Sequence, residues 1–291
     1  MERLHLPDNI KVHFAGCENF SDAKILDEMG GNYCLFSALP FVLKKVEKDI
    51  SETKIPTFLS DNMKHVIQDS GLYSMLFGKL KGEITKKFVF NWYDAYVGWT
   101  IDHGRDITCV ELDAQSIIGV DETWSLRKKI KEDLPNNRII NVFHLQDGQY
   151  GLDRLIDYSD YLAIGMVELR KFGKQDYAYP LVQYIKKRKP SIDIHLLGFT
   201  DFAHIRKYRY CTSCDSITWL SPRRFGELEN ERVANFDTRK VQEMVGVDRW
   251  IKCKGDRAEE VTNTMCVSVE RWKHKCTRML GNQDVKWIYN D

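Results

Sequence analysis

The sequence predicts an α/β fold, specifically a (β/α)8 (TIM) barrel with a small C-terminal helical extension. Apolar runs of strand length alternate with helical patterns along the chain, and about eight such runs occur. Several of them end at an aspartate or a glycine, the position where parallel barrels carry functional side chains. The length of 291 residues accommodates a barrel of about 250 residues and a modest appendage.

The expected strands are apolar runs with turn residues at their ends. In chain order they cover residues 11–16, 33–39, 65–67, 107–112, 139–145, 161–164 and 194–197, and the eighth carries Cys214 and Asp215. The expected helices have apolar residues three and four positions apart. They cover residues 21–29, 41–50, 83–100, 124–134, 150–158 and 177–188. The aromatic residues of 83–100 are interpreted as a core-facing stripe rather than a base-stacking surface.

Residues 1–230 are expected to form the barrel core, and residues 231–291 a helical closure and extension. Beyond residue 226 the pattern changes to two helical segments, 232–245 and 258–279. Three cysteines and one histidine lie in this region without any CxxC pair: Cys253, Cys266, His274 and Cys276. We therefore expect no zinc subdomain and no bound metal.

Composition constrains the partners and the compartment. The chain has 43 basic and 42 acidic residues, so attraction to a nucleic acid must come from local patches rather than from the net charge of +1. No apolar stretch approaches 18 residues, and the N-terminus lacks a signal-peptide pattern. Eight irregularly spaced cysteines are typical of a reducing compartment. A soluble, cytoplasmic protein without a membrane partner is expected; its oligomeric state is left open.

Four of the expected strand ends carry polar side chains, and in a parallel barrel these ends meet at one mouth. They are Asp69, Asp113, Gln146 and Asp215. Three carboxylates around one pocket repel one another, so at least one should have a raised pKa and be able to carry a proton. This set suits a reaction at a glycosidic carbon, in which one carboxylate attacks and another moves a proton. Recognition of a nucleobase edge and metal-dependent hydrolysis use the same residue types and stay open at this point.

Five segments carry a resemblance to a known family. DSGLYSM (69–75), HLQDGQYGLDR (144–154) and YLAIGMVEL (161–169) resemble the DSGG-aromatic-Q, VQGG and YAIGGLAVGE segments of the queuine tRNA-ribosyltransferases, also called tRNA-guanine transglycosylases. IHLLGFTDF (194–202), followed by CDSITWLSPRRFG (214–226), is similar to their YLMGVGTPEDL and FDCVMPTRNARNG segments. The matches keep their order through roughly residues 65–226, and five motifs in order are far more specific than one.

The resemblance implies a covalent glycosyl mechanism without a cofactor. Asp215 matches the aspartate that attacks the sugar C1′ and keeps it as a covalent intermediate, and Asp69 matches the general acid/base for the departing and incoming bases. The implied base-binding residues bond the edge of the base, supply backbone contacts or cover its two faces: Asp113, Gln146, Gly165, Tyr73 and Leu197.

The chain also departs from the family's pattern. Leu72 and Asp147 stand where the family has glycines, and Met166 is expected to narrow or reshape the pocket. The family's CxCxxC zinc motif with a later histidine does not occur after the last expected strand. In this respect the chain is most similar to the shortened DNA-guanine transglycosylases (DpdA type) of phages and bacteria, which would place it in the host cytoplasm if it is phage-encoded.

That similarity implies exchange of guanine in DNA for a free 7-deazaguanine base such as 7-cyano-7-deazaguanine. Contacts with the DNA backbone are expected from basic residues near the nucleophile: Arg223, Arg224, Arg206, Lys207 and Arg209. A tRNA-guanine transglycosylase is the alternative within the same class. A non-catalytic nucleic-acid-binding partner subunit is the alternative outside it, although such a protein gains nothing from two carboxylates facing a polyanion.

Overall fold

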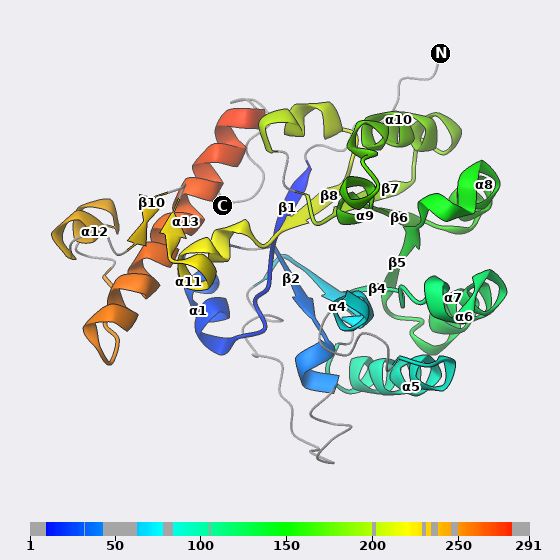
Figure 1. Ribbon diagram of the computed structural model, residues 1–291, viewed down its shortest axis with the longest axis horizontal. Helices are drawn as coiled ribbons and strands as arrows, with labels where there is room; N and C mark the ends of the chain where they lie inside the picture. The colour runs from blue at the N-terminus through cyan, green and yellow to red at the C-terminus, as the bar shows by residue number, and fades with distance from the viewer. Residues whose placement is uncertain are drawn as a thin grey trace.

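Eight parallel strands form a closed barrel surrounded by helices, which confirms the expected fold class (Figure 1). The computed structural model describes residues 10–31, 33–42, 63–77, 84–104, 106–199, 202–228, 231–233, 238–245 and 250–280. The strands pair in chain order, and β8 pairs with β1 to close the barrel. They are β1 (Lys11–Ala15), β2 (Tyr33–Ser37), β3 (His65–Asp69), β4 (Thr108–Val110), β5 (Arg138–Phe143), β6 (Tyr161–Gly165), β7 (Asp193–Leu197) and β8 (Ser213–Ser216).

The connections between the strands are helical wherever the structure describes them at length. They contain α1 (Phe20–Glu28), α4 (Leu72–Phe77), α5 (Lys86–His103), α6 (Gln115–Ile118), α7 (Val120–Asp133), α8 (Gly148–Tyr158), α9 (Met166–Lys171) and α10 (Ala178–Arg188), with 3-10 helices η1 (Leu145–Asp147), η2 (Gln175–Tyr177) and η3 (Phe202–Tyr208). Most of the expected helix at 41–50 lies outside the described residues. Helix α5 begins later than expected because Thr85 caps it, its hydroxyl accepting from the Phe88 N–H at 3.2 Å.

The aromatic residues of α5 face the core, as the sequence predicts. Trp92, Tyr93, Tyr96 and Trp99 are all buried. Trp92 Nε1 donates to the Ser70 carbonyl at 3.1 Å, and the Tyr96 hydroxyl donates to the Val110 carbonyl at 3.0 Å. Helix α5 therefore fixes the carboxyl ends of β3 and β4, where the candidate site residues lie.

The interior of the barrel is a packed core of two layers. An apolar layer lies nearer the carboxyl ends of the strands, and a polar layer lies nearer their amino ends. The apolar layer comprises Ala15, Leu35, Ile67, Val110, Ile140, Val142, Tyr161 and Ala163, with Leu197 packed against it. In the polar layer His13 Nε2 and His65 Nδ1 are 2.8 Å apart, and His65 Nε2 lies 2.9 Å from Thr108 Oγ1. Burial lowers the pKa of His13, and that of His65 to about 4, so both rings are neutral near pH 7. The apolar layer thus separates the mouth from the opposite end of the barrel.

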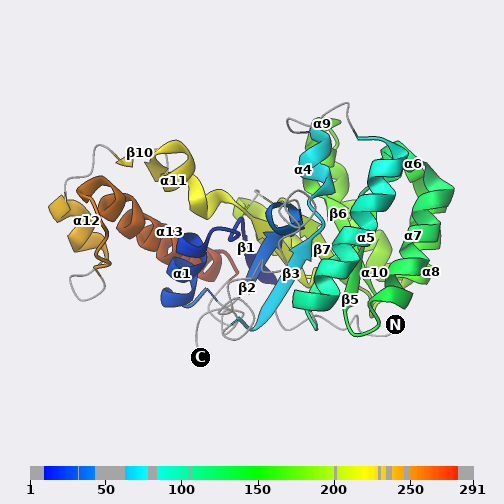
Figure 2. The same ribbon diagram turned by 90° about the horizontal axis from the view of Figure 1, so that it is seen from below.

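The C-terminal segments extend to one side of the barrel (Figure 2). They comprise η4 (Thr218–Leu220), α11 (Ser221–Phe225), the antiparallel pair β9 (Glu227–Leu228) and β10 (Glu231–Arg232), α12 (Thr238–Val245) and α13 (Asp256–Leu280). The sequence pattern did not indicate the hairpin. Helix α13 contacts α1 and α11, and its Met265, Cys266 and Val269 join the main core.

A smaller apolar cluster lies beneath the hairpin, where α13 packs against it. Its members are Leu228, Val233, Val241 and Val267. Asn263 of α13 holds the loop before this helix by two hydrogen bonds. Its Oδ1 accepts from the Ile251 N–H and its Nδ2 donates to the Ile251 carbonyl, both at 2.8 Å. Among the described side chains, no three metal-ligating groups are gathered closely enough to bind an ion; those of His274 and Cys276 lie outside this description. None of the described helices is both long and apolar enough to cross a membrane.

Candidate active site

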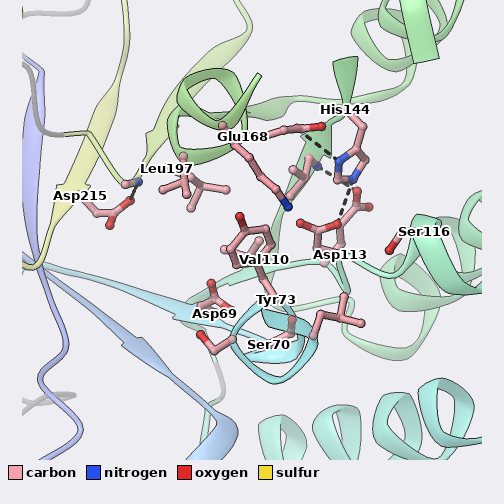
Figure 3. Close-up of a pocket in the computed structure, with 18 of the residues that line it drawn as sticks. Asp69, Ser70, Tyr73, Val110, Asp113, Ser116, His144, Glu168, Leu197 and Asp215 are labelled. Atoms are coloured by element: carbon pink, nitrogen blue, oxygen red, sulfur yellow. Dashed lines mark hydrogen bonds and ion pairs between the residues drawn. The ribbon is translucent and has the colours of Figure 1, made fainter. Parts of the chain in front are cut away.

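A pocket of about 370 Å³ opens at the carboxyl ends of the strands (Figure 3). All seven residues expected to act on the sugar or the base line it: Asp69, Tyr73, Asp113, Gln146, Gly165, Leu197 and Asp215. The strand register explains part of this convergence, because Gly165 on β6 lies beside Leu197 on β7. Figure 3 shows Asp69 and Asp215 toward one side of the pocket and Asp113 toward the other.

Asp215, on β8, is buried and oriented by two donors. Its Oδ1 accepts from the Gly198 N–H at 2.8 Å and lies 3.1 Å from His195 Nε2. Among the described residues no donor contacts its other oxygen, Oδ2. One oxygen is therefore fixed, and the second is available for a reaction.

His195 connects Asp215 to a chain of hydrogen bonds inside the barrel. Its Nδ1 lies 2.6 Å from Ser213 Oγ, which in turn bonds the hydroxyl of Tyr161. Burial raises the pKa of Tyr161, so this phenol keeps its proton and acts as a donor. The chain is satisfied throughout if Tyr161 donates to Ser213, Ser213 donates to Nδ1, and Nε2–H donates to Asp215.

Gly198 is required by the geometry of this turn. Its φ of +66° lies in the left-handed region, and a Cβ there would come within 2.7 Å of Val167 Cγ2. Only glycine allows the chain to turn so that its N–H reaches Asp215.

Asp69 ends β3 in a different environment. Its Oδ1 accepts from the Gly71 N–H at 2.6 Å. Burial, reinforced by the negative charges of Asp215 and Asp113, raises the pKa of Asp69 to about 6 although the Gly71 N–H opposes the shift. Near neutral pH this carboxyl can therefore both give and take a proton.

The opposite side of the pocket contains three ionisable groups, from the segments that follow β4, β5 and β6. His144 Nε2 is 3.1 Å from Asp113 Oδ1, and His144 Nδ1 is 3.6 Å from Glu168 Oε2 (Figure 3). Burial alone would lower the pKa of His144, but the two carboxylates outweigh it and raise the pKa to about 10. His144 is thus an imidazolium near neutral pH. Sequence reasoning missed both His144 and Glu168, although His144 directly follows β5 inside the HLQDG motif.

A buried ion pair supports the loop that carries Asp113. Arg127 Nε, on α7, contacts both carboxylate oxygens of Glu111 at 2.8 and 3.0 Å, and Arg127 Nη2 donates to the Val142 carbonyl at 2.9 Å. Glu111 also accepts from the Val142 N–H and from the Asn141 amide at 2.9 and 2.6 Å. This network joins β4 to β5 just before Asp113, and the sequence pattern did not indicate it.

Three departures from the family pattern lie outside the pocket. Met166 was expected to reshape it, but its side chain packs in the core cluster beside α9, and Val167 lines the pocket instead. Leu72 is buried in the main core. The carboxylate of Asp147 accepts from Gln115 Nε2 and is directed toward α6.

The five basic residues expected to contact phosphates do not line the pocket. Arg223 forms an ion pair with Asp22 at 2.9 Å, while Arg224 is exposed with its guanidinium 5.6 Å from the Phe225 ring. Lys207 borders a second cavity, which Met166 and Arg170 of α9 also line, and Arg206 is exposed on the same 3-10 helix. Arg209 directly follows this 3-10 helix and is exposed, with its guanidinium 5.2 Å from the Tyr210 ring.

Comparison of the sequence with protein-family models and with curated proteins finds no match to either.

Proposed function

We propose that this protein is a guanine transglycosylase that exchanges guanine in DNA for a free 7-deazaguanine base, with 7-cyano-7-deazaguanine as the reference substrate. The observation that carries the proposal is the difference between two carboxyls in one pocket. Asp215 has one oxygen fixed by donors, and Asp69 has a pKa near 6. A nucleophile and a proton carrier are the two groups that glycosyl exchange needs.

In the first step, Asp215 Oδ2 attacks C1′ of the target nucleotide. The C1′–N9 bond breaks, its electron pair stays on guanine, and the Asp69 proton neutralises the departing base. In the second step, Asp69 accepts a proton from the incoming base as its N9 attacks C1′. The C1′–O bond breaks and the Asp215 carboxylate is restored, so the cycle requires no oxidant, reductant or metal.

The far side of the pocket offers groups that match the edge of a guanine-like base. The Asp113 side chain would accept from N1–H and the 2-amino group, and the Gln146 amide would donate to O6. The cationic His144 lies 3.1 Å from Asp113 Oδ1 and orients this side chain. The Tyr73 ring and the Leu197 side chain lie at the pocket wall and would cover the faces of a flat base.

DNA is proposed rather than tRNA for two reasons. The zinc motif of the tRNA enzymes, CxCxxC with a later histidine, does not occur in the sequence. A 2′-deoxyribose also tolerates positive charge at C1′ more easily than ribose, because it lacks the electron-withdrawing hydroxyl.

The test is an exchange assay with labelled guanine or 7-cyano-7-deazaguanine and either duplex DNA or tRNA. We expect label in DNA, no label with Asp215→Asn, and no effect of a chelator. Label in tRNA alone would overturn the DNA assignment. Failure to label either nucleic acid would favour the non-catalytic partner subunit, and loss of activity with the chelator would favour metal-dependent chemistry.

A further inference from the structure

Most of the exposed large apolar side chains lie in segments that follow the carboxyl ends of the barrel strands. Eight of the nine in the described part of the chain follow the carboxyl ends of strands: Phe20, Val120, Tyr150, Val167, Phe172, Tyr177, Ile217 and Phe225. The ninth, Ile101, lies near the end of α5 at the opposite face. Two of the eight, Val167 and Phe172, also line the pocket, and exposed apolar side chains at the edge of a pocket are typical of an interaction site.

Phe172 is the more exposed of the two side chains at the edge of the pocket. Its side chain is 59% exposed and also borders the pocket. It terminates α9, and its N–H bonds the Glu168 carbonyl at 3.1 Å. The next residue, Gly173, has a φ of +65°, and the Lys174 N–H returns to the Leu169 carbonyl at 2.7 Å. This is a closed helix cap, so the ring is presented from a fixed backbone.

The charge of the same segment indicates a negatively charged partner. Every residue of 170–177 is exposed, and the segment contains Arg170, Lys171 and Lys174 against one acidic residue, Asp176. Lys171 borders the pocket beside Phe172. Helix α9 lies at the same end of the barrel as α4, the helix that carries Tyr73 (top of Figure 2). Cationic side chains bind the phosphates of a nucleic acid, and an aromatic ring can enter its base stack. Both lie here at the edge of the pocket, so the segment fits a nucleic acid whose target base has turned out of the stack into the pocket.

We infer that Phe172 is a wedge that enters the base stack of duplex DNA where the target guanosine has left it. The inference rests on the proposed function and specifies its substrate as a duplex. A base inside a duplex cannot reach Asp215 unless the nucleotide is extruded, which costs a few kcal/mol. An apolar side chain that fills the vacated space offsets part of that cost.

The test compares Phe172→Ala with the wild-type protein on three substrates that differ only at the target guanine. The first has guanine paired with cytosine, the second has it opposite an abasic site, and the third is single-stranded. We expect Phe172→Ala to lower kcat/KM on the paired duplex by about ten-fold. On the other two substrates the extrusion cost is already reduced, so the kcat/KM values of the two proteins should agree within about two-fold.

Two further variants serve as controls. Phe172→Leu keeps an apolar wedge and should retain most of the activity on the paired duplex. Ile101→Ala removes a side chain of similar exposure, 58%, from the opposite face, and should change nothing. A 2-aminopurine placed next to the target guanine reports unstacking directly: its fluorescence should rise with wild-type protein and rise less with Phe172→Ala.

The outcomes separate the wedge from the proposed function. An equal loss on all three substrates, or exchange confined to single strands in the wild type, would overturn the wedge and leave the transglycosylase proposal standing. No exchange on any DNA by the wild-type protein would remove the proposed function, and this inference with it.

Discussion

Asp69 and Asp215 have the same side chain but different hydrogen-bond partners. Asp215 Oδ1 accepts from a backbone N–H and lies 3.1 Å from a histidine nitrogen, while no donor among the described residues contacts its Oδ2. Asp69 accepts one N–H, which lowers its pKa, but burial and two neighbouring carboxylates outweigh this effect and raise the pKa to about 6. The division of roles between nucleophile and proton carrier therefore follows from local environment.

Because its pKa is raised, the ionised form of Asp69 destabilises the folded protein. The folded state binds the proton more tightly than the unfolded state, so the free energy of unfolding falls as pH rises from about 4 to about 6. Asp69→Asn removes this term while keeping an acceptor for Gly71. We expect the variant to lose exchange but to gain about 1–3 kcal/mol in free energy of unfolding at pH 8.

Urea unfolding of both proteins at pH 4 and pH 8 measures this effect. The difference between them should be small at pH 4, where Asp69 is protonated in the wild type as well. An equal difference at both pH values would show that the Asp69 charge is not its origin.

The same group should govern the pH dependence of the first chemical step. Protonated Asp69 is needed when guanine departs, so formation of the covalent intermediate should slow as pH rises through about 6. Single-turnover quenching of enzyme with a guanine-containing oligonucleotide, across pH 5 to 9, gives this profile. A rate that rises through this range instead would contradict the role of Asp69 as the acid.

At the scale of elements, the segments after β4 and β5 and helix α9 after β6 are joined by the ion pairs of His144 with Asp113 and Glu168. We expect His144→Phe to raise KM for the free base by at least about ten-fold, because the two carboxylates lose the cation between them. His144→Gln keeps hydrogen-bonding capacity without the charge and should show a smaller increase. Steady-state kinetics with the free base as the varied substrate decide this; an unchanged KM in both variants would exclude His144 from base recognition.

Helix α7 contributes through the buried pair of Arg127 and Glu111, whose side chains are 2% and 4% exposed. Arg127→Met leaves the Glu111 carboxylate buried without its partner, so we expect a loss of about 3–5 kcal/mol in the free energy of unfolding. The double substitution Glu111→Gln with Arg127→Met removes the stranded charge and should recover part of this loss. Chemical denaturation of the three proteins tests the account, which fails if the double variant is no more stable than Arg127→Met.

At the scale of the whole molecule, local patterning was sufficient to predict the barrel and its mouth. The alternation of apolar runs with helical segments placed the strands, and parallel strands necessarily bring their carboxyl ends together. Asp69, Asp113, Gln146 and Asp215 could therefore be assigned to one pocket from the sequence, and the structure places all four there.

Partners that are distant in sequence could not be found in the same way. The pairing of Arg223 with Asp22 depends on β8 closing the barrel against β1, so the sequence alone left Arg223 as a candidate phosphate contact. The contacts of His144 and His195 also join separate strands, and no local pattern indicates them.

The most direct test of the central claim is a denaturing gel of the protein mixed with a guanine-containing DNA oligonucleotide. We expect a protein band shifted by the mass of the oligonucleotide, which disappears when excess free guanine is added before quenching and does not form with Asp215→Asn. A shifted band that persists in Asp215→Asn, or none in a wild-type preparation that exchanges labelled base, would contradict a covalent glycosyl intermediate on Asp215.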